Sequence, residues 1–142
     1  MTPRQALARL FEGVRADTAD YGVLRDLLEQ QFAAALAHRS EEITAVVERI
    51  LELTATLSAR SKERTQLAAL ILGGKRSSIS MRDISARLPA NARKTFDAAW
   101  QRLESLVREC KRLNARNAHL LMTQRDIMQR VLGTEADTYA PA

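Results

Sequence analysis

The stretch CKRLNARNAHLLMTQRDIMQRVL, Cys110 to Leu132, decides the fold because its apolar residues recur at alternating steps of three and four. This spacing extends back to Phe96 and is typical of a long helix that packs through a narrow apolar stripe, here called the seam. The seam consists of Phe96, Ala99, Leu103, Leu106, Cys110, Leu113, Asn117, Leu120, Gln124, Ile127 and Val131. Two of its members, Asn117 and Gln124, are polar, which a self-contained helix would not require.

Two earlier segments have the same helical period. A first helix is predicted over residues 3–38, started by a capping box of Thr2 and Gln5 with Pro3 as its first residue. The stretch GVRADTADYG at 13–22 contains residues that disfavour helix, so the sequence leaves open whether this helix is broken there. A second helix is predicted over 40–72, with Ser40 as its cap and glycines at its end.

The last helix is predicted over residues 90–132, after Pro89, and a short polar and flexible tail over 133–142. The 142 residues are 46% hydrophobic and only 4% aromatic, and no strand-like segment competes with the helices. We therefore expect a single all-α domain over residues 1–142, an elongated antiparallel three-helix bundle with coiled-coil-like packing. The long C-terminal helix is expected to extend past the second one.

The sequence argues against an enzyme and against a bound cofactor or metal. The stretch ALILGGKRSS matches a phosphate-binding loop only at Gly74 and Lys75, and it follows a helix instead of a strand. The two histidines are far apart in the chain without neighbouring metal ligands. Cys110 lies on the seam, where a thiol serves as a small apolar group. No catalytic, cofactor-binding or metal-binding residue is predicted.

Charge is unevenly distributed, with a net charge of −3 over residues 1–57, +9 over 58–116 and −1 over 117–142. A basic middle region raises the alternative of a protein that binds nucleic acid or another polyanion. A solvated helical face with internal ion pairs explains the same pattern. Because only two aromatic residues, Phe96 and Trp100, accompany the basic stretch, a nucleic-acid site is the less favoured interpretation.

The polar end of the seam favours a surface for a partner. A buried amide without a hydrogen-bond partner costs about 1 to 3 kcal/mol, so Asn117 and Gln124 weaken the end of a closed bundle. The surrounding leucines and methionines supply more apolar surface than a narrow stripe can cover, which suits the binding of a helix. The alternative is that Asn117 sets the register of the bundle, as single seam asparagines do.

The chain also resembles a known family. Residues AAALAHRSEEI at 33–43, the glycines at 73–74, LPANARKTFDAAW at 88–100, CKRLNARNAHLL from Cys110 and a tyrosine just before the last proline carry the resemblance. They are similar to the FlgN-type flagellar export chaperones over about Tyr21 to Tyr139, and Cys110, Asn114 and Asn117 weigh most.

The resemblance implies a bacterial cytoplasmic chaperone for type III secretion. It would bind the C-terminal helices of flagellar hook-associated proteins, prevent their premature assembly and deliver them to the flagellar export gate. It further implies that Tyr139 docks the chaperone at that gate. The partner-binding residues predicted from the seam and the resemblance are Leu113, Asn114, Asn117, Leu120, Leu121, Gln124, Ile127, Met128 and Val131. A homodimeric coiled-coil adaptor is a further alternative.

Overall fold

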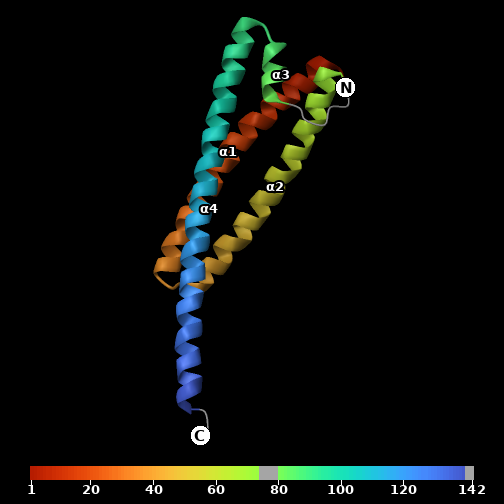
Figure 1. Cartoon of the computed structure of the whole chain (residues 1–142). Coiled ribbons are helices and arrows are strands. Elements are labelled where there is room, and N and C mark those ends of the chain that lie inside the picture. The colour runs from red at the N-terminus through yellow and green to blue at the C-terminus, as the bar shows by residue number, and fades with distance from the viewer. Residues whose placement is uncertain (74–79, 140–142) are drawn as a thin grey trace.

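Helices make up the described part of the chain, which comprises residues 1–73 and 80–139 of a computed structural model, with side chains up to residue 133. In chain order they are α1 (Pro3–Leu36), α2 (Ser40–Leu72), α3 (Met81–Ala86) and α4 (Ala90–Tyr139) (Figure 1). Within these residues no strand occurs, and the prediction of an all-α fold with a long C-terminal helix is confirmed.

The first helix is continuous through residues 13–22. The acidic side chains that would otherwise compete for its backbone are held by other partners. Asp17 is 1% exposed and accepts hydrogen bonds from Arg60 at 2.7 Å and Arg64 at 2.6 Å, and Asp20 pairs with Arg60 at 2.9 Å. Because these arginines come from α2, the contact between the helices keeps the middle of α1 helical.

The first cap agrees with its prediction, and the second does not. Gln5 N donates to Thr2 Oγ1 at 3.2 Å while Thr2 N donates to Gln5 Oε1 at 2.9 Å, which completes the capping box. Ser40, in contrast, is the first residue of α2, and Arg39 stands at the cap without a side-chain hydrogen bond. The chain turns through a left-handed His38, φ 55°, and this tight turn leaves Ser40 already helical.

Of the two later helix ends, the end of α2 agrees with its prediction and the end of α4 does not. Gly73 ends α2 in the left-handed conformation, φ 69°, whereas Gly74, also expected there, lies outside the described residues. Ser80 accepts from the backbone N–H of Arg82 and starts the short helix α3. α4 continues beyond its expected end at Leu132 to Tyr139, since no proline interrupts residues 133–139.

α1 is the central helix of the molecule. It packs against α2, which is antiparallel to it, and against α4, which runs parallel to it (Figure 1). The backbones of α2 and α4 make no direct contact among the described residues, and the two helices diverge toward the end that carries α3. The bundle is therefore elongated, and α2 and α4 are separated along it. At the end where they diverge, α3 packs against both of them.

A charged layer divides the apolar core. The cluster at the α3 end contains Ala6, Leu10, Leu67, Ala68, Leu72, Ile84, Leu88 and Phe96. The cluster toward the α1–α2 turn contains Leu24, Leu28, Leu57, Cys110 and Leu113. Between them lies the buried Asp17 with its two arginines, of which Arg64 also stands over the ring of Trp100 on α4, 5.3 Å from its centroid. This layer links all three long helices.

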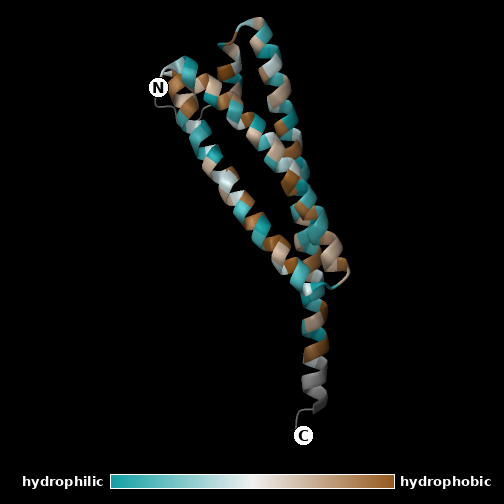
Figure 2. Cartoon of the chain, turned by 180° about the vertical axis from the view of Figure 1, so that it is seen from behind, coloured by the Kyte–Doolittle hydropathy of each residue, from teal (hydrophilic) through white to brown (hydrophobic). Residues whose placement is uncertain are grey.

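The long helices differ in length, and the difference produces a projection. α1 has 34 residues and α4 has 50. At 1.5 Å per residue they span about 51 Å and about 75 Å. α4 therefore extends well past the turn that joins α1 to α2 (Figure 1), and the projecting part carries hydrophobic residues (Figure 2). We call residues 125–139 the projecting segment.

Candidate partner-binding surface

Asn117, the first polar member of the seam, is satisfied inside the molecule. It is 2% exposed, and its Nδ2 donates to the carbonyl oxygen of Leu28 at 2.7 Å and to Oε1 of Gln31 at 2.8 Å. Its Oδ1 accepts from the guanidinium of Arg116 at 3.1 and 3.2 Å. The amide therefore has partners on both of its ends, and its burial does not weaken the bundle.

The same relationship recurs one heptad before and one heptad after Asn117. Cys110 Sγ lies 3.4 Å from the carbonyl oxygen of Tyr21 in a weak hydrogen bond, and Gln124 Nε2 donates to the carbonyl oxygen of Ala35 at 2.9 Å. Each of the three acceptors precedes its donor by 89 residues. This constant offset is the register of two parallel helices that coil around each other, and we call the three bonds the register ladder.

The ladder ends with α1. The next residue of its heptad column, Val131, has no counterpart because α1 stops at Leu36. Past this point the large apolar side chains of α4 are exposed to between 48% and 59% of their surface; they are Ile127, Met128, Val131 and Leu132. Leu36, the last residue of α1, is itself 56% exposed. An apolar surface thus begins where the bundle ends.

The structure divides the predicted partner-binding residues into three groups. Leu113 and Asn117 are buried against α1, so their side chains are not available to a partner in this state. Leu120, Leu121 and Gln124 are partly buried at the edge of the bundle. The exposed group consists of Asn114, Ile127, Met128 and Val131. The side chain of Tyr139 lies outside the described residues.

Two features of this region do not follow from the seam. Leu36 extends the apolar surface onto α1, and the pattern of α1 alone does not reveal it because its exposure depends on where the chain turns. Arg116 lies over the ring of Phe32, 3.7 Å from its centroid, and donates to Glu29 at 2.8 Å. The spacing of these residues within their own helices gives no signal for a contact between helices.

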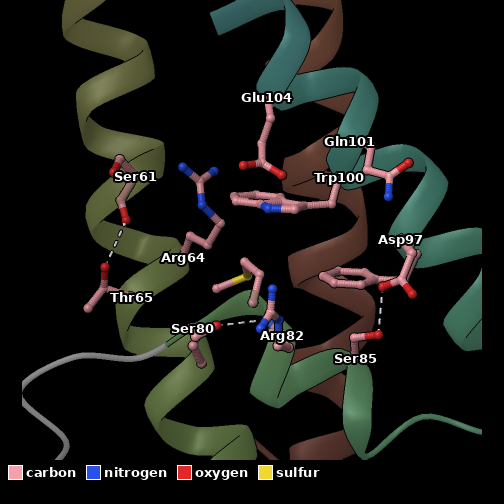
Figure 3. Close-up of a pocket in the computed structure, with 13 residues that line it drawn as sticks. Ser61, Arg64, Thr65, Ser80, Arg82, Ser85, Asp97, Trp100, Gln101 and Glu104 are labelled. Atoms are coloured by element: carbon pink, nitrogen blue, oxygen red, sulfur yellow. Dashed lines mark hydrogen bonds between the residues drawn. The ribbon is translucent and has the colours of Figure 1, made fainter. Parts of the chain in front are cut away.

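A depression lies at the opposite end of the bundle, between α2, α3 and α4. It has a volume of about 730 Å³, and Figure 3 shows Arg64, Trp100 and Glu104 at one side and Asp97 with Ser85 at the other. Ser85 Oγ donates to Asp97 at 2.6 Å, and Arg64 is neutralised by Asp17. The pair of Ser85 and Asp97 joins α3 to α4, and no histidine or lysine is among the residues that line the depression.

The remaining chemistry is structural. Burial raises the pKa of the Cys110 thiol to about 11, with the nearby Glu109 acting in the same direction, so this thiol is protonated near neutral pH. Among residues 1–73 and 80–133 we find no group of three or more potential metal ligands. None of the described helices is long and apolar enough to span a membrane.

The comparison with known families covers both the register ladder and the exposed apolar residues up to Leu132. Residues 1–134 match the family model described as FlgN protein. No curated protein and no solved structure matches the chain. The family match covers nearly the entire sequence, and the chain therefore belongs to the FlgN protein family, which is a family of flagellar export chaperones and not of enzymes.

Proposed function

We propose that the chain is a bacterial cytoplasmic chaperone that binds the C-terminal helices of flagellar hook-associated proteins. By holding these helices it prevents premature assembly, and it delivers its client to the flagellar type III export gate. The observation that carries the proposal is the apolar surface that begins at the end of α1, which is exposed in the free chain. Membership of the FlgN family supports the general role.

The exposure of each side chain guides our choice of residues for the proposed surface. We assign client contact to Leu120, Leu121, Gln124, Ile127, Met128 and Val131, with Leu132 and Leu36 added. Asn114 stays at the edge as an exposed polar contact. Leu113 and Asn117 instead fix the orientation of α4 on α1, which is a supporting role. We also propose that Tyr139 docks the chaperone at the flagellar export gate.

The expected energies guide the choice of variants. Full burial of a large aliphatic side chain contributes about 1.5 to 3 kcal/mol, so a half-exposed one gains roughly 1 kcal/mol when a client covers it. A single substitution would therefore have a modest effect. Two charges introduced on this face, as in the double variant Ile127→Glu with Val131→Glu, would add desolvation costs and should abolish binding.

The test is co-elution of the purified chain with C-terminal segments of the organism's hook-associated proteins. The wild type should form a complex, and the double variant should not. Met122→Glu is the control for adding a glutamate to α4 outside this face, because Met122 is 64% exposed but lies about 140° around the helix from Ile127. A chain truncated after Gln124 keeps the register ladder and should also lose the client. Unchanged affinity in the truncated chain would refute the assignment of this surface.

Two further measurements, the salt dependence of binding and light scattering, separate the two alternative functions. Binding to a nucleic acid falls steeply with salt, whereas an apolar helix interface responds only weakly. A homodimeric adaptor would give a stable dimer in light scattering that a client does not change. Several arginines of the basic region already have internal partners, among them Arg60, Arg64 and Arg116, which favours the chaperone over the polyanion-binding protein.

A further inference from the structure

A groove with basic edges lies between α1 and α4, away from the projecting segment. Its volume is about 720 Å³, and its lining runs along α1 from Val14 to Arg25 and along α4 from Ala99 to Glu109. It is on the side of α1 opposite α2, since Gly22 lies about 140° around the helix from Asp17, which faces α2. Glu109, its last residue on α4, precedes Gln124 by about 22 Å of helix.

The floor of the groove is apolar and only partly covered by the protein's own side chains. Leu106 belongs to the seam but is only half-buried, and it stands across the groove from small residues of α1 that include Ala19 and Gly22. A Cβ atom built on Gly22 would meet no other atom within 4 Å, so this position is open space. The two parallel helices thus leave a furrow that a third helix can fill with its own side chains.

The edges of the groove carry a net positive charge. Arg15 and Arg25 line it from α1 and Arg102 from α4, against one acidic residue, Glu109. Arg15 and Arg102 have no ion-pair partner among the described residues, and Arg25 makes only a 3.5 Å contact with the adjacent Asp26. The charges of these three arginines are therefore available to a partner, whereas Arg60 and Arg64 of the charged layer are paired with Asp17.

We infer that this groove binds an acidic amphipathic helix of a partner protein. The apolar side of such a helix covers Leu106 and the open space at Gly22, and its carboxylates meet the three arginines. The groove suits a helix better than a nucleic acid, because no aromatic side chain lines it for stacking on bases and Glu109 repels phosphates. This site is separate from the projecting segment and goes beyond client binding.

The probe for the test is a fluorescein-labelled synthetic helix of about 18 residues with leucine on one face and glutamate on the other. Anisotropy with the full chain should show saturable binding that weakens with salt. In the double variant Arg15→Glu with Arg102→Glu, affinity should fall about tenfold or more, because attraction becomes repulsion. Arg4→Glu with Arg49→Glu, two exposed sites outside the groove, is the control with equal charge change and should bind as the wild type.

A second variant removes the dependence on charge. Gly22→Leu fills the open space, and because leucine favours helix over glycine it should bind the probe poorly while folding at least as well as the wild type. The inference is overturned if the acidic helix does not bind, or if the groove variants bind it as the control does. It is equally overturned if a lysine-leucine helix binds as well, or if a single-stranded oligonucleotide binds more tightly through the same arginines.

Discussion

The side-chain amide of Asn117 and the backbone carbonyl of Leu28 are joined by a 2.7 Å hydrogen bond between α4 and α1. The bond ties a side chain to main-chain atoms, so it does not depend on the side chain of Leu28. It fixes the position of α4 along α1, and through α4 it sets where the projecting segment begins. Of the two interpretations that the sequence leaves open for Asn117, this bond supports the one in which the residue sets the register of the bundle.

Asn117→Asp tests this role with almost no change in shape. The variant loses both donors and places a carboxylate opposite two acceptors, the Leu28 carbonyl and Gln31 Oε1. We expect it to lower the free energy of unfolding by about 3 kcal/mol, as for an uncompensated buried charge, with Arg116 offsetting a part. Urea unfolding measures the change. Asn114→Asp, an exposed neighbour on the same helix, should change stability by less than about 0.5 kcal/mol.

The buried charge of Asp17 should matter more than any surface pair. Asp17→Ala leaves Arg64 without its carboxylate and Arg60 with only Asp20, and we expect a loss of about 3 to 5 kcal/mol in unfolding free energy. The comparison variant is Asp26→Ala, which breaks an exposed pair with Arg25 and should cost less than about 1 kcal/mol. Equal effects of the two variants would show that the charged layer does not hold α2 on α1.

Substitution by alanine should change the stability of the protein in opposite directions at two glycines, Gly22 and Gly73. Gly22 lies inside α1 and a Cβ there meets nothing within 4 Å, so Gly22→Ala should stabilise the protein by about 0.5 to 1 kcal/mol. Gly73 ends α2 at φ 69°, and Gly73→Ala should destabilise it by about 1 kcal/mol. Thermal unfolding followed by circular dichroism measures both. A destabilising Gly22→Ala would mean that this surface of α1 is covered in solution.

The sequence predicts the helices better than it predicts their contacts. The bounds of α2 follow from local signals, because the acidic first turn after Ser40 and the left-handed Gly73 lie at its two ends. Only the capping residue differs, since Arg39 and not Ser40 stands at the cap. The continuity of α1 does not follow, since Asp17 is held by Arg60 and Arg64, which are more than forty positions away in the chain. Local propensity is overridden there by a tertiary contact.

The candidate surface has the same limit. The apolar period assigns Leu113, Asn117, Ile127 and Val131 to one face of α4. It does not reveal that, of these four, α1 covers Leu113 and Asn117 and leaves Ile127 and Val131 exposed. That boundary depends on the offset between α1 and α4, a relation between distant segments that periodicity within one helix does not contain. The length of α1 and the register ladder together determine it.

The Cys110 thiol provides a prediction for alkaline pH. Burial raises its pKa from an ordinary value of 9.0 to about 11, so the folded state holds the proton more tightly than the unfolded chain does. Its contribution to stability is therefore complete below pH 9 and is lost as the pH rises from 9 to about 11. Tyr21 also has a raised pKa, caused mainly by burial. Because Tyr21 is present in both the wild type and Cys110→Ala, a comparison of these two proteins isolates the effect of the thiol. We expect the difference in unfolding free energy between wild type and Cys110→Ala to shrink across this range. A difference that stays constant from pH 8 to 11 would show that the thiol is not shielded by the contact of α1 with α4.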